Sequence, residues 1–167
     1  MKSVWTGFWA WYERHYTLNV VFSLGLFLLQ LVHLFWLATN VIAPRLLGIS
    51  FFEFTGIWRY LIVAVDYTEV PALISVSLIY INELRKRWHW QSLMYLVFLN
   101  TQWLHLFWIT DEFVIHAFLR EAHGGTILPV WLAWIAIMID YLEVPVIIDT
   151  FRKVGRALRK GERIVIE

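Results

Sequence analysis

The chain has 167 residues, a net charge of +1, a mean hydropathy of +0.61 and 60% hydrophobic residues, with 11 tryptophans among its aromatic residues. A water-soluble domain of this length does not carry so much apolar side-chain surface, so the composition indicates an integral membrane protein. The absence of cysteine excludes disulfides, thiolate metal sites, iron–sulfur clusters and covalently attached c-type haem.

The N-terminal segment, residues 1–17, precedes the first apolar run and carries aromatic residues at helical spacing. Trp5, Phe8, Trp9 and Tyr12 would share one face of a short helix. Aromatic side chains of this kind favour the boundary between lipid and water. We therefore expect residues 1–17 to form an interfacial segment in the headgroup region.

Four apolar stretches follow, and each is long enough to cross a hydrocarbon core, which needs roughly 20 helical residues. Lipid cannot satisfy backbone hydrogen-bonding groups, so we expect each stretch to be an α-helix. The predicted spans are residues 18–43, 57–82, 91–118 and 127–150.

The positive charges indicate an orientation for these spans. Lysine and arginine gather in the N-terminal segment, in residues 85–87 and in the basic tail, residues 151–167. With four spans, all three regions lie on one side of the membrane, and only Arg45, Arg59 and Arg120 lie on the other. Because short cytoplasmic regions are enriched in Lys and Arg, both termini are predicted to be cytoplasmic.

The chain also contains an internal repeat. QLVHLFW at 30–36 recurs as QWLHLFW at 102–108, and VDYTEVP at 65–71 recurs as IDYLEVP at 139–145. Order and spacing are both retained, so repeat 1 is residues 18–87 and repeat 2 is residues 88–150. Each repeat has two spans, which relates the halves by a pseudo-twofold axis along the membrane normal. The predicted fold is all-α, a membrane four-helix bundle of two tandem two-helix repeats.

The repeated motifs place ionisable residues near the middle of the spans. No lysine or arginine lies in the central part of a span to neutralise them, and an isolated charge at that depth costs on the order of 3 kcal/mol. Within each motif the aspartate and glutamate are three residues apart, so they share one helix face and can converge on one centre. The predicted metal ligands are His33, Asp66, Glu69, His105, Asp140 and Glu143.

This set of two histidines and four carboxylates resembles the ligand inventory of the ferritin-like di-iron and di-manganese bundles. The motif differs, because those proteins use Glu-x-x-His and this chain uses Asp-x-x-Glu with the histidine on another helix. Two divalent cations would neutralise the four carboxylates, as an apolar interior favours. We expect two transition metal ions, iron first, with zinc or manganese as alternatives.

Residues beside the predicted ligands suggest supporting roles. Gln30 and Gln102 lie one turn before each histidine and could orient a ligand carboxylate or a bound water. Pro145 and its counterpart at position 71 should kink their helices and free carbonyls at the level of the carboxylates. Tyr67 and its counterpart at position 141 point away from the aspartates and are expected to bond a neighbouring helix.

Several alternatives remain open from the sequence. His33 and His105 lie at one depth and could be axial ligands of a b-type haem. The same residues could form a proton or ion pathway, or a structural metal site in a subunit of a membrane complex. Glu112 and His116 could form an entry path at the non-cytoplasmic end, although a solvated helix end explains them more simply.

A buried metal site of this composition favours redox chemistry with an apolar partner. We expect a metal-dependent oxidoreductase that acts on a quinol or on a lipid chain, because hydrolysis would need water at the bilayer centre. The sequence identifies no catalytic residue beyond the ligands. The expected partners are the bilayer and such a substrate, with subunits of a membrane complex as a further partner and no nucleic acid.

Overall fold

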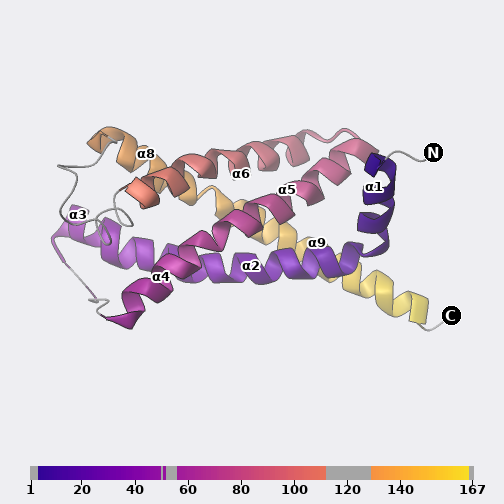
Figure 1. Cartoon of the computed structure of the whole chain (residues 1–167), viewed down its shortest axis with the longest axis horizontal. Helices are drawn as coiled ribbons and strands as arrows, with labels where there is room; N and C mark the ends of the chain where they lie inside the picture. The colour runs from indigo at the N-terminus through magenta and orange to yellow at the C-terminus, as the bar shows by residue number, and fades with distance from the viewer. Residues whose placement is uncertain (1–3, 50, 52–55, 112–128, 166–167) are drawn as a thin grey trace.

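The computed structural model of the chain describes residues 4–49, 51, 56–111 and 129–165, which are helical except for short connections and contain no strand (Figure 1). The elements are α1 (Val4–Arg14), α2 (Tyr16–Leu37), the π-helical η1 (Ala38–Ile42), α3 (Ala43–Leu47), α4 (Ile57–Tyr67), α5 (Glu69–Lys86), α6 (Trp90–Ile109), α8 (Val130–Asp140) and α9 (Glu143–Val165).

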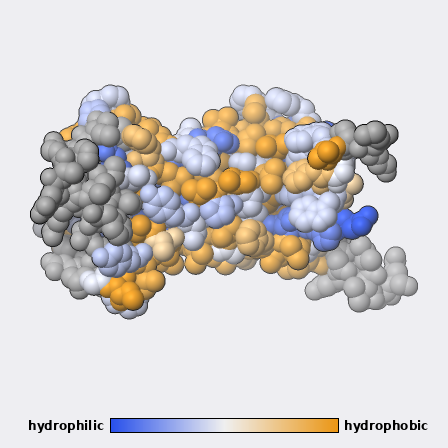
Figure 2. All heavy atoms as spheres, viewed as in Figure 1, coloured by the Kyte–Doolittle hydropathy of each residue, from blue (hydrophilic) through white to orange (hydrophobic). Residues whose placement is uncertain are grey.

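Three continuous helical segments are long and apolar enough to cross a membrane, as judged over the described residues. They are Tyr16–Leu47 with 32 residues, Tyr60–Lys86 with 27 and Val130–Arg159 with 30. Large apolar side chains are exposed along them, including Phe22, Phe35 and Ile148. Figure 2 shows apolar side chains, interspersed with pale-coloured ones, along the middle of the visible face, as suits a lipid environment. The chain therefore has the properties of a membrane protein.

The third predicted span, 91–118, corresponds to α6 as far as the structure describes it. This helix has 20 residues and is not among the three segments above. Its polar side chains at positions 91, 100, 102 and 105 lower its hydropathy, and residues 112–118 lie outside the described part of the chain. Gln102 and His105 are completely buried, so these two polar groups face the protein interior.

The long helices pack side by side. α2 contacts α5 and α9, and α6 contacts the same two helices as well as α8. Apolar side chains fill the space between them, and one core cluster contains Phe27 from α2, Val76 from α5, Leu99 from α6 and Val146 from α9. A second cluster, which includes Trp36, Trp108 and Ala136, continues the core toward the end of the molecule at which α4 and α8 begin. Two apolar clusters thus lie on either side of the level at which α4 and α8 end.

One end of the molecule carries both ends of the described chain and the connection between α5 and α6, while α3 and the beginnings of α4 and α8 lie at the opposite end (Figure 1). The first end also carries the basic residues 85–87, at the end of α5 and just after it, and those of α9. A strongly hydrophilic patch is visible there in Figure 2. Positive charge is therefore concentrated at one end.

Helix α1 lies across this end rather than along the long helices (Figure 1). Trp9 and Tyr12 are buried against the protein, and the Arg85 guanidinium lies 4.7 Å from the centre of the Trp9 ring. Arg85 also forms a salt bridge with Glu13. Trp5 and Trp11 remain exposed on the other face. The aromatic residues predicted to share one face are thus divided between the protein and its surroundings.

Candidate metal centre

The two histidines of the repeated motif meet in the interior. His33 from α2 and His105 from α6 are buried, and their Nε2 atoms are 3.1 Å apart. The two rings are nearly perpendicular, at 78°, with their centres 5.2 Å apart. Residues 72 positions apart in the sequence therefore present the same nitrogen to a common point.

The second nitrogen of each ring is held by an acceptor. Nδ1 of His33 lies 2.5 Å from Oδ1 of Asp66, and Nδ1 of His105 lies 3.0 Å from the carbonyl oxygen of Ala136. In each case the imidazole N–H donates to the oxygen, which fixes the proton of a neutral ring on Nδ1. If both rings are neutral, both Nε2 atoms carry lone pairs that face each other. This arrangement is common in metal-bound histidines, whose other N–H is held by a carboxylate or a carbonyl.

Asp140 lies against both histidines. Its Oδ2 atom is 3.3 Å from Nε2 of His33, and its Oδ1 atom is 3.8 Å from Nε2 of His105. His33, His105 and Asp140 each offer a ligand atom, and these atoms all lie within 4.8 Å of one another. Asp140 is the last residue of α8, so the end of that helix brings the carboxylate to the histidines.

A second group of potential ligands shares Asp140 and adds Glu69 and Glu143, with ligand atoms that also lie within 4.8 Å of one another. Both glutamates are buried, and among the described residues none donates a hydrogen bond to their carboxylate oxygens. Unpartnered carboxylates in an apolar interior are costly unless a proton or a cation neutralises them. The two groups together define one cluster with Asp140 between them.

Local helix breaks place these carboxylates. α4 ends at Tyr67 and α5 begins at Glu69, while α8 ends at Asp140 and α9 begins at Glu143. A proline cannot bond the carbonyl four residues before it. In each copy that carbonyl lies at the break, as the sequence predicts. Glu69 and Glu143 are each the first residue of a helix, where the partial positive charge of the helix end favours a carboxylate.

Gln30 and Gln102 are completely buried beside the breaks. The Gln30 amide donates to Oγ1 of Thr68 at 3.0 Å, and the Gln102 amide donates to the carbonyl oxygen of Ile139 at 3.0 Å. Both side chains thus donate to residues at or beside the helix breaks rather than to a ligand carboxylate. Thr68 and the Ile139 carbonyl were not expected from the sequence, because a break in a helix does not reveal which helix will bond to it.

Further features recur around the two histidines. The Trp36 ring centre lies 5.7 Å from the His33 ring centre, and the Trp108 ring centre lies 5.4 Å from that of His105. A π-helical turn begins five residues after each histidine, at position 38 and at position 110. The Tyr67 hydroxyl lies 2.9 Å from Oγ1 of Thr110, which is a bond to a neighbouring helix of the kind expected. The Trp residues could have been anticipated from the HLFW repeat, but the π-helical turns have no evident sequence signal.

The structure thus gathers all six predicted ligand residues in one buried region, but they do not all face the same centre. Five of them form the two ligand groups, whereas Asp66 lies behind His33 on Nδ1. Glu112 and His116, which could form an entry path, lie outside the described residues. Comparison of the chain with protein families, with curated proteins and with solved structures finds no match.

Proposed function

We propose that the cluster is a dinuclear metal centre inside a membrane-embedded four-helix bundle, and that the protein is a metal-dependent oxidoreductase. The observation that carries the proposal is the pair of Nε2 atoms 3.1 Å apart, each on a ring whose Nδ1 is already bonded to an acceptor. Two lone pairs at this distance repel unless an electrophile lies between them. In a protein interior that electrophile is a metal ion or a proton.

The spacing of these atoms suits one metal ion. Two ligands at about 2.0–2.1 Å from a metal lie about 3.0 Å apart in an octahedral site and about 3.4 Å apart in a tetrahedral one. The nitrogen pair at 3.1 Å and the contact of His33 with Asp140 at 3.3 Å fall in this range. The third contact, between His105 and Asp140, is 3.8 Å and would close slightly on binding.

The same geometry argues against haem. Axial nitrogens on opposite faces of a porphyrin are about 4 Å apart, twice a metal–nitrogen bond of about 2 Å, and a flat macrocycle separates them. Here Asp140 lies against both Nε2 atoms, so a porphyrin would have to displace its carboxylate. Haem would also leave Glu69 and Glu143 buried without partners.

A second ion would be held by Asp140, Glu69 and Glu143. Two divalent ions would balance the three carboxylates of the cluster together with that of Asp66 behind His33, which would leave the region electrically neutral. Nitrogen and oxygen ligands without sulfur suit iron, with zinc and manganese as alternatives. Asp140 belongs to both ligand groups, so it would help to hold both ions.

The number of ligands supports a catalytic centre over a structural one. Each proposed ion has three protein side chains, and catalytic sites typically leave a position for substrate or water where structural sites are closed. When bound, the ions would supply electron transfer. The chain's own part is to hold them through the histidines and the buried carboxylates and to keep water out.

The expected reductant is a quinol or another apolar donor that reaches the bundle from the lipid phase. Oxidation of one quinol to a quinone would release two electrons and two protons, and the bound ions would supply the electron transfer. Dioxygen, which dissolves in lipid, is the terminal oxidant that we expect: the two electrons and two protons of one quinol reduce it to hydrogen peroxide, and those of two quinols reduce it to water. An acyl chain of a lipid is the alternative substrate.

The arrangement of the elements supports the fold assignment that accompanies this function. α2 and α6 each contact α5 and α9, which is the neighbour pattern of a four-helix bundle. We take the matched histidine, tryptophan and helix-break environments as the mark of two tandem repeats. The basic end, which carries both ends of the described chain, would face the cytoplasm.

The test is the metal content of the purified full-length protein, measured by inductively coupled plasma mass spectrometry and paired with absorption spectroscopy. The proposal predicts two transition metal ions per chain. A Soret band with one iron per chain would assign the histidines to haem. A protein that binds neither metal nor haem, even after incubation with ferrous, manganous and zinc salts, would exclude the proposed centre.

One metal-free alternative has an observation in its favour. A single proton shared between the Nε2 atoms of His33 and His105 would also remove the lone-pair repulsion, because 3.1 Å is a normal hydrogen-bond distance. The cluster would then be part of a proton pathway, with Glu69 and Glu143 protonated. A metal-free protein that carries protons across vesicle membranes, and loses this activity on Glu69→Gln substitution, would establish that alternative.

A further inference from the structure

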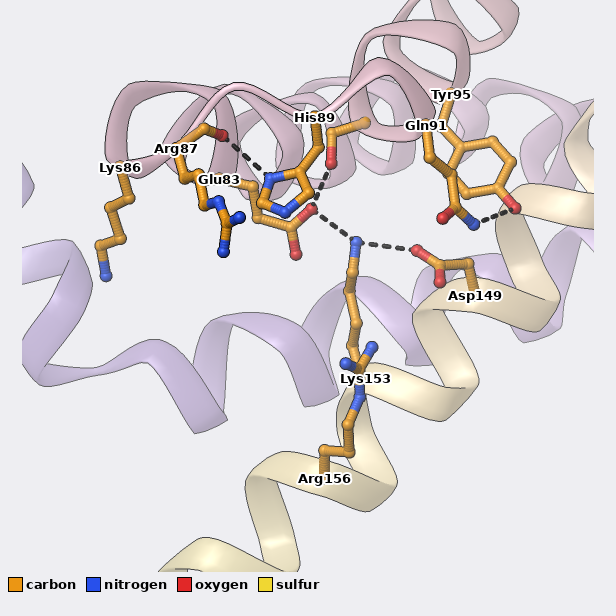
Figure 3. Close-up of a pocket in the computed structure, with 10 residues that line it drawn as sticks. Glu83, Lys86, Arg87, His89, Gln91, Tyr95, Asp149, Lys153 and Arg156 are labelled. Atoms are coloured by element: carbon orange, nitrogen blue, oxygen red, sulfur yellow. Dashed lines mark hydrogen bonds and ion pairs between the residues drawn. The ribbon is translucent and has the colours of Figure 1, made fainter.

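A polar pocket of about 330 Å³ lies at the basic end of the molecule, away from the metal cluster. Figure 3 shows its walls, which come from the C-terminal part of α5, the first turn and a half of α6 and the middle of α9. Four cationic and two anionic side chains line it, which leaves a surplus of two positive charges. The pocket is independent of the proposed metal centre.

The anionic side chains of the pocket are already satisfied. The Lys153 ammonium lies 2.9 Å from Oε2 of Glu83 and 2.7 Å from Oδ2 of Asp149. Glu83 also accepts a hydrogen bond from the Ser92 hydroxyl, and Asp149 accepts one from the Tyr80 hydroxyl. Lys153 is buried and contacts the face of the Tyr80 ring at 3.9 Å. This inner group is therefore rigid and bonded on several sides.

The two arginines of the pocket, Arg87 and Arg156, have fewer bonds than Lys153. Within the described part of the chain, Arg87 and Arg156 form no salt bridge, and the one recorded bond of the Arg156 side chain runs from Nε to the carbonyl of Arg152. His89 donates from Nδ1 to the carbonyl of Arg87 at 3.0 Å, which ties down the connection between α5 and α6. In Figure 3 the two arginines stand on different elements, α9 and the end of α5, on the borders of one space.

Two guanidinium groups without carboxylate partners beside a pocket form a site for an oxyanion, since arginine binds phosphate through paired N–H donors. The start of α6 contributes Gln91 and Ser92 to the wall, and the first turn of a helix carries partial positive charge. The bonded carboxylates Glu83 and Asp149 do not compete for the arginines as long as Lys153 holds them.

The position of the pocket indicates the source of the phosphate. It lies where α5, α6 and α9 leave their apolar segments, and the neighbouring Trp88 and Trp90 are 66% and 71% exposed. Exposed tryptophans at the ends of membrane helices lie at the depth of the lipid headgroups. Basic pockets between helices at this depth suit anionic headgroups. We propose that this pocket binds a phosphate group, and that an anionic phospholipid supplies it.

The test uses the full-length protein in detergent and short-chain phosphatidylglycerol, with individual bound lipids counted by native mass spectrometry. The test variant carries Arg87→Gln and Arg156→Gln. The matched control carries Arg152→Gln and Arg159→Gln, which removes the same charge from exposed arginines of α9 that do not line the pocket. A micelle has little surface charge of its own, so diffuse attraction contributes little.

We expect the test variant to bind phosphatidylglycerol about tenfold more weakly than the wild type and the control variant to change by less than about twofold. Equal losses in the two variants would overturn the proposal, because binding would then reflect general charge. Equal melting temperatures of the two variants would confirm that both are folded. Should the test variant fail to fold, lipid binding by Arg87→Gln alone is compared with that by Arg152→Gln, with the same criterion.

Two further probes separate the sources of the phosphate. Phosphatidylcholine, which is zwitterionic, should bind more weakly than phosphatidylglycerol, and inorganic phosphate at millimolar concentration should displace little lipid. Displacement by inorganic phosphate that depends on Arg87 and Arg156 would retain the phosphate site and assign it to a soluble ligand. If neither phosphatidylglycerol nor inorganic phosphate binds, the site is overturned.

Discussion

Asp66 and Asp140 bind opposite nitrogens of the His33 ring. Oδ1 of Asp66 is 2.5 Å from Nδ1, and Oδ2 of Asp140 is 3.3 Å from Nε2. The two aspartates occupy the same position in the repeated DYxEVP motif, so their sequence contexts are nearly identical. Asp140 faces both histidines, whereas Asp66 lies on the opposite side of the His33 ring. In the proposed centre Asp140 is a ligand and Asp66 orients one. In the second repeat the carbonyl of Ala136 replaces the carboxylate on Nδ1.

The first prediction follows from this difference. Asp66→Asn keeps an oxygen that can accept from His33 and should weaken metal binding by about 10–100-fold, as expected for a residue that supports a ligand. Asp140→Asn removes the charge shared by both ligand groups and should abolish binding of at least one ion. The measurement is metal affinity by competition with a chelator. Equal effects of the two substitutions would mean that Asp66 is itself a ligand.

The second prediction concerns the unpartnered glutamates. Glu69→Gln and Glu143→Gln should each lose one ion per chain and lower the melting temperature by roughly 5–10 °C, because ligand-linked stabilisation is lost. Without metal, the same substitutions would leave stability unchanged or raise it, since a buried carboxylate without partners is costly. The sign of the change in melting temperature thus separates the two cases.

The control for the glutamates is Glu13→Gln. Glu13 lies on α1, far from the cluster, and pairs with Arg85 and Lys86 of α5. This substitution should therefore leave the metal content at the wild-type value. Loss of metal in this variant as well would show that metal content reports general damage to the fold.

The third prediction is a pH dependence of metal binding. Histidine and carboxylate ligands bind metal only when deprotonated, so metal release requires proton uptake. The unpartnered carboxylates would be neutral in the apolar interior once the ions leave. Affinity should therefore fall as the pH falls, and release should consume protons from a weakly buffered solution. Metal affinity that is constant between about pH 5 and pH 8 would contradict a centre built from these ligands.

The fourth prediction compares two buried tyrosines near the basic end. The Tyr12 hydroxyl has no hydrogen-bond partner among the described residues, and burial raises the pKa of this hydroxyl, so it remains neutral. The Tyr80 hydroxyl donates to Asp149 at 2.9 Å. Tyr12→Phe should therefore raise the free energy of unfolding by about 1 kcal/mol, and Tyr80→Phe should lower it by about 1 kcal/mol. Unfolding in mixed micelles with increasing denaturing detergent measures both.

The two substitutions remove the same hydroxyl group, but the expected changes in the free energy of unfolding have opposite signs. Destabilisation by Tyr12→Phe would show that its hydroxyl has a partner, such as a water molecule or a lipid headgroup. The metal content of both variants should equal that of the wild type, since neither residue touches the cluster.

Much of the fold follows directly from the sequence. Hydropathy and length predict helices that can cross a membrane, and three such helices are present in the described residues. The prolines of the DYxEVP motifs predict helix breaks at the carboxylates, and the breaks occur there because proline cannot bond the carbonyl four residues earlier. The spacing of each aspartate and glutamate places both on one face, and each of these carboxylates is buried. These features depend on local periodicity and covalent structure alone.

The tertiary structure decided what each buried group touches. The two motif copies differ only at positions 65/139 and 68/142, yet one aspartate lies behind a histidine and the other faces both. The partners of Gln30 and Gln102, and the carbonyl that holds His105, come from neighbouring helices. Helical periodicity fixes a residue's depth and face to within several ångströms. A hydrogen bond or a metal ligand is defined to a few tenths of an ångström, and that depends on how each helix rotates and tilts as the whole core packs.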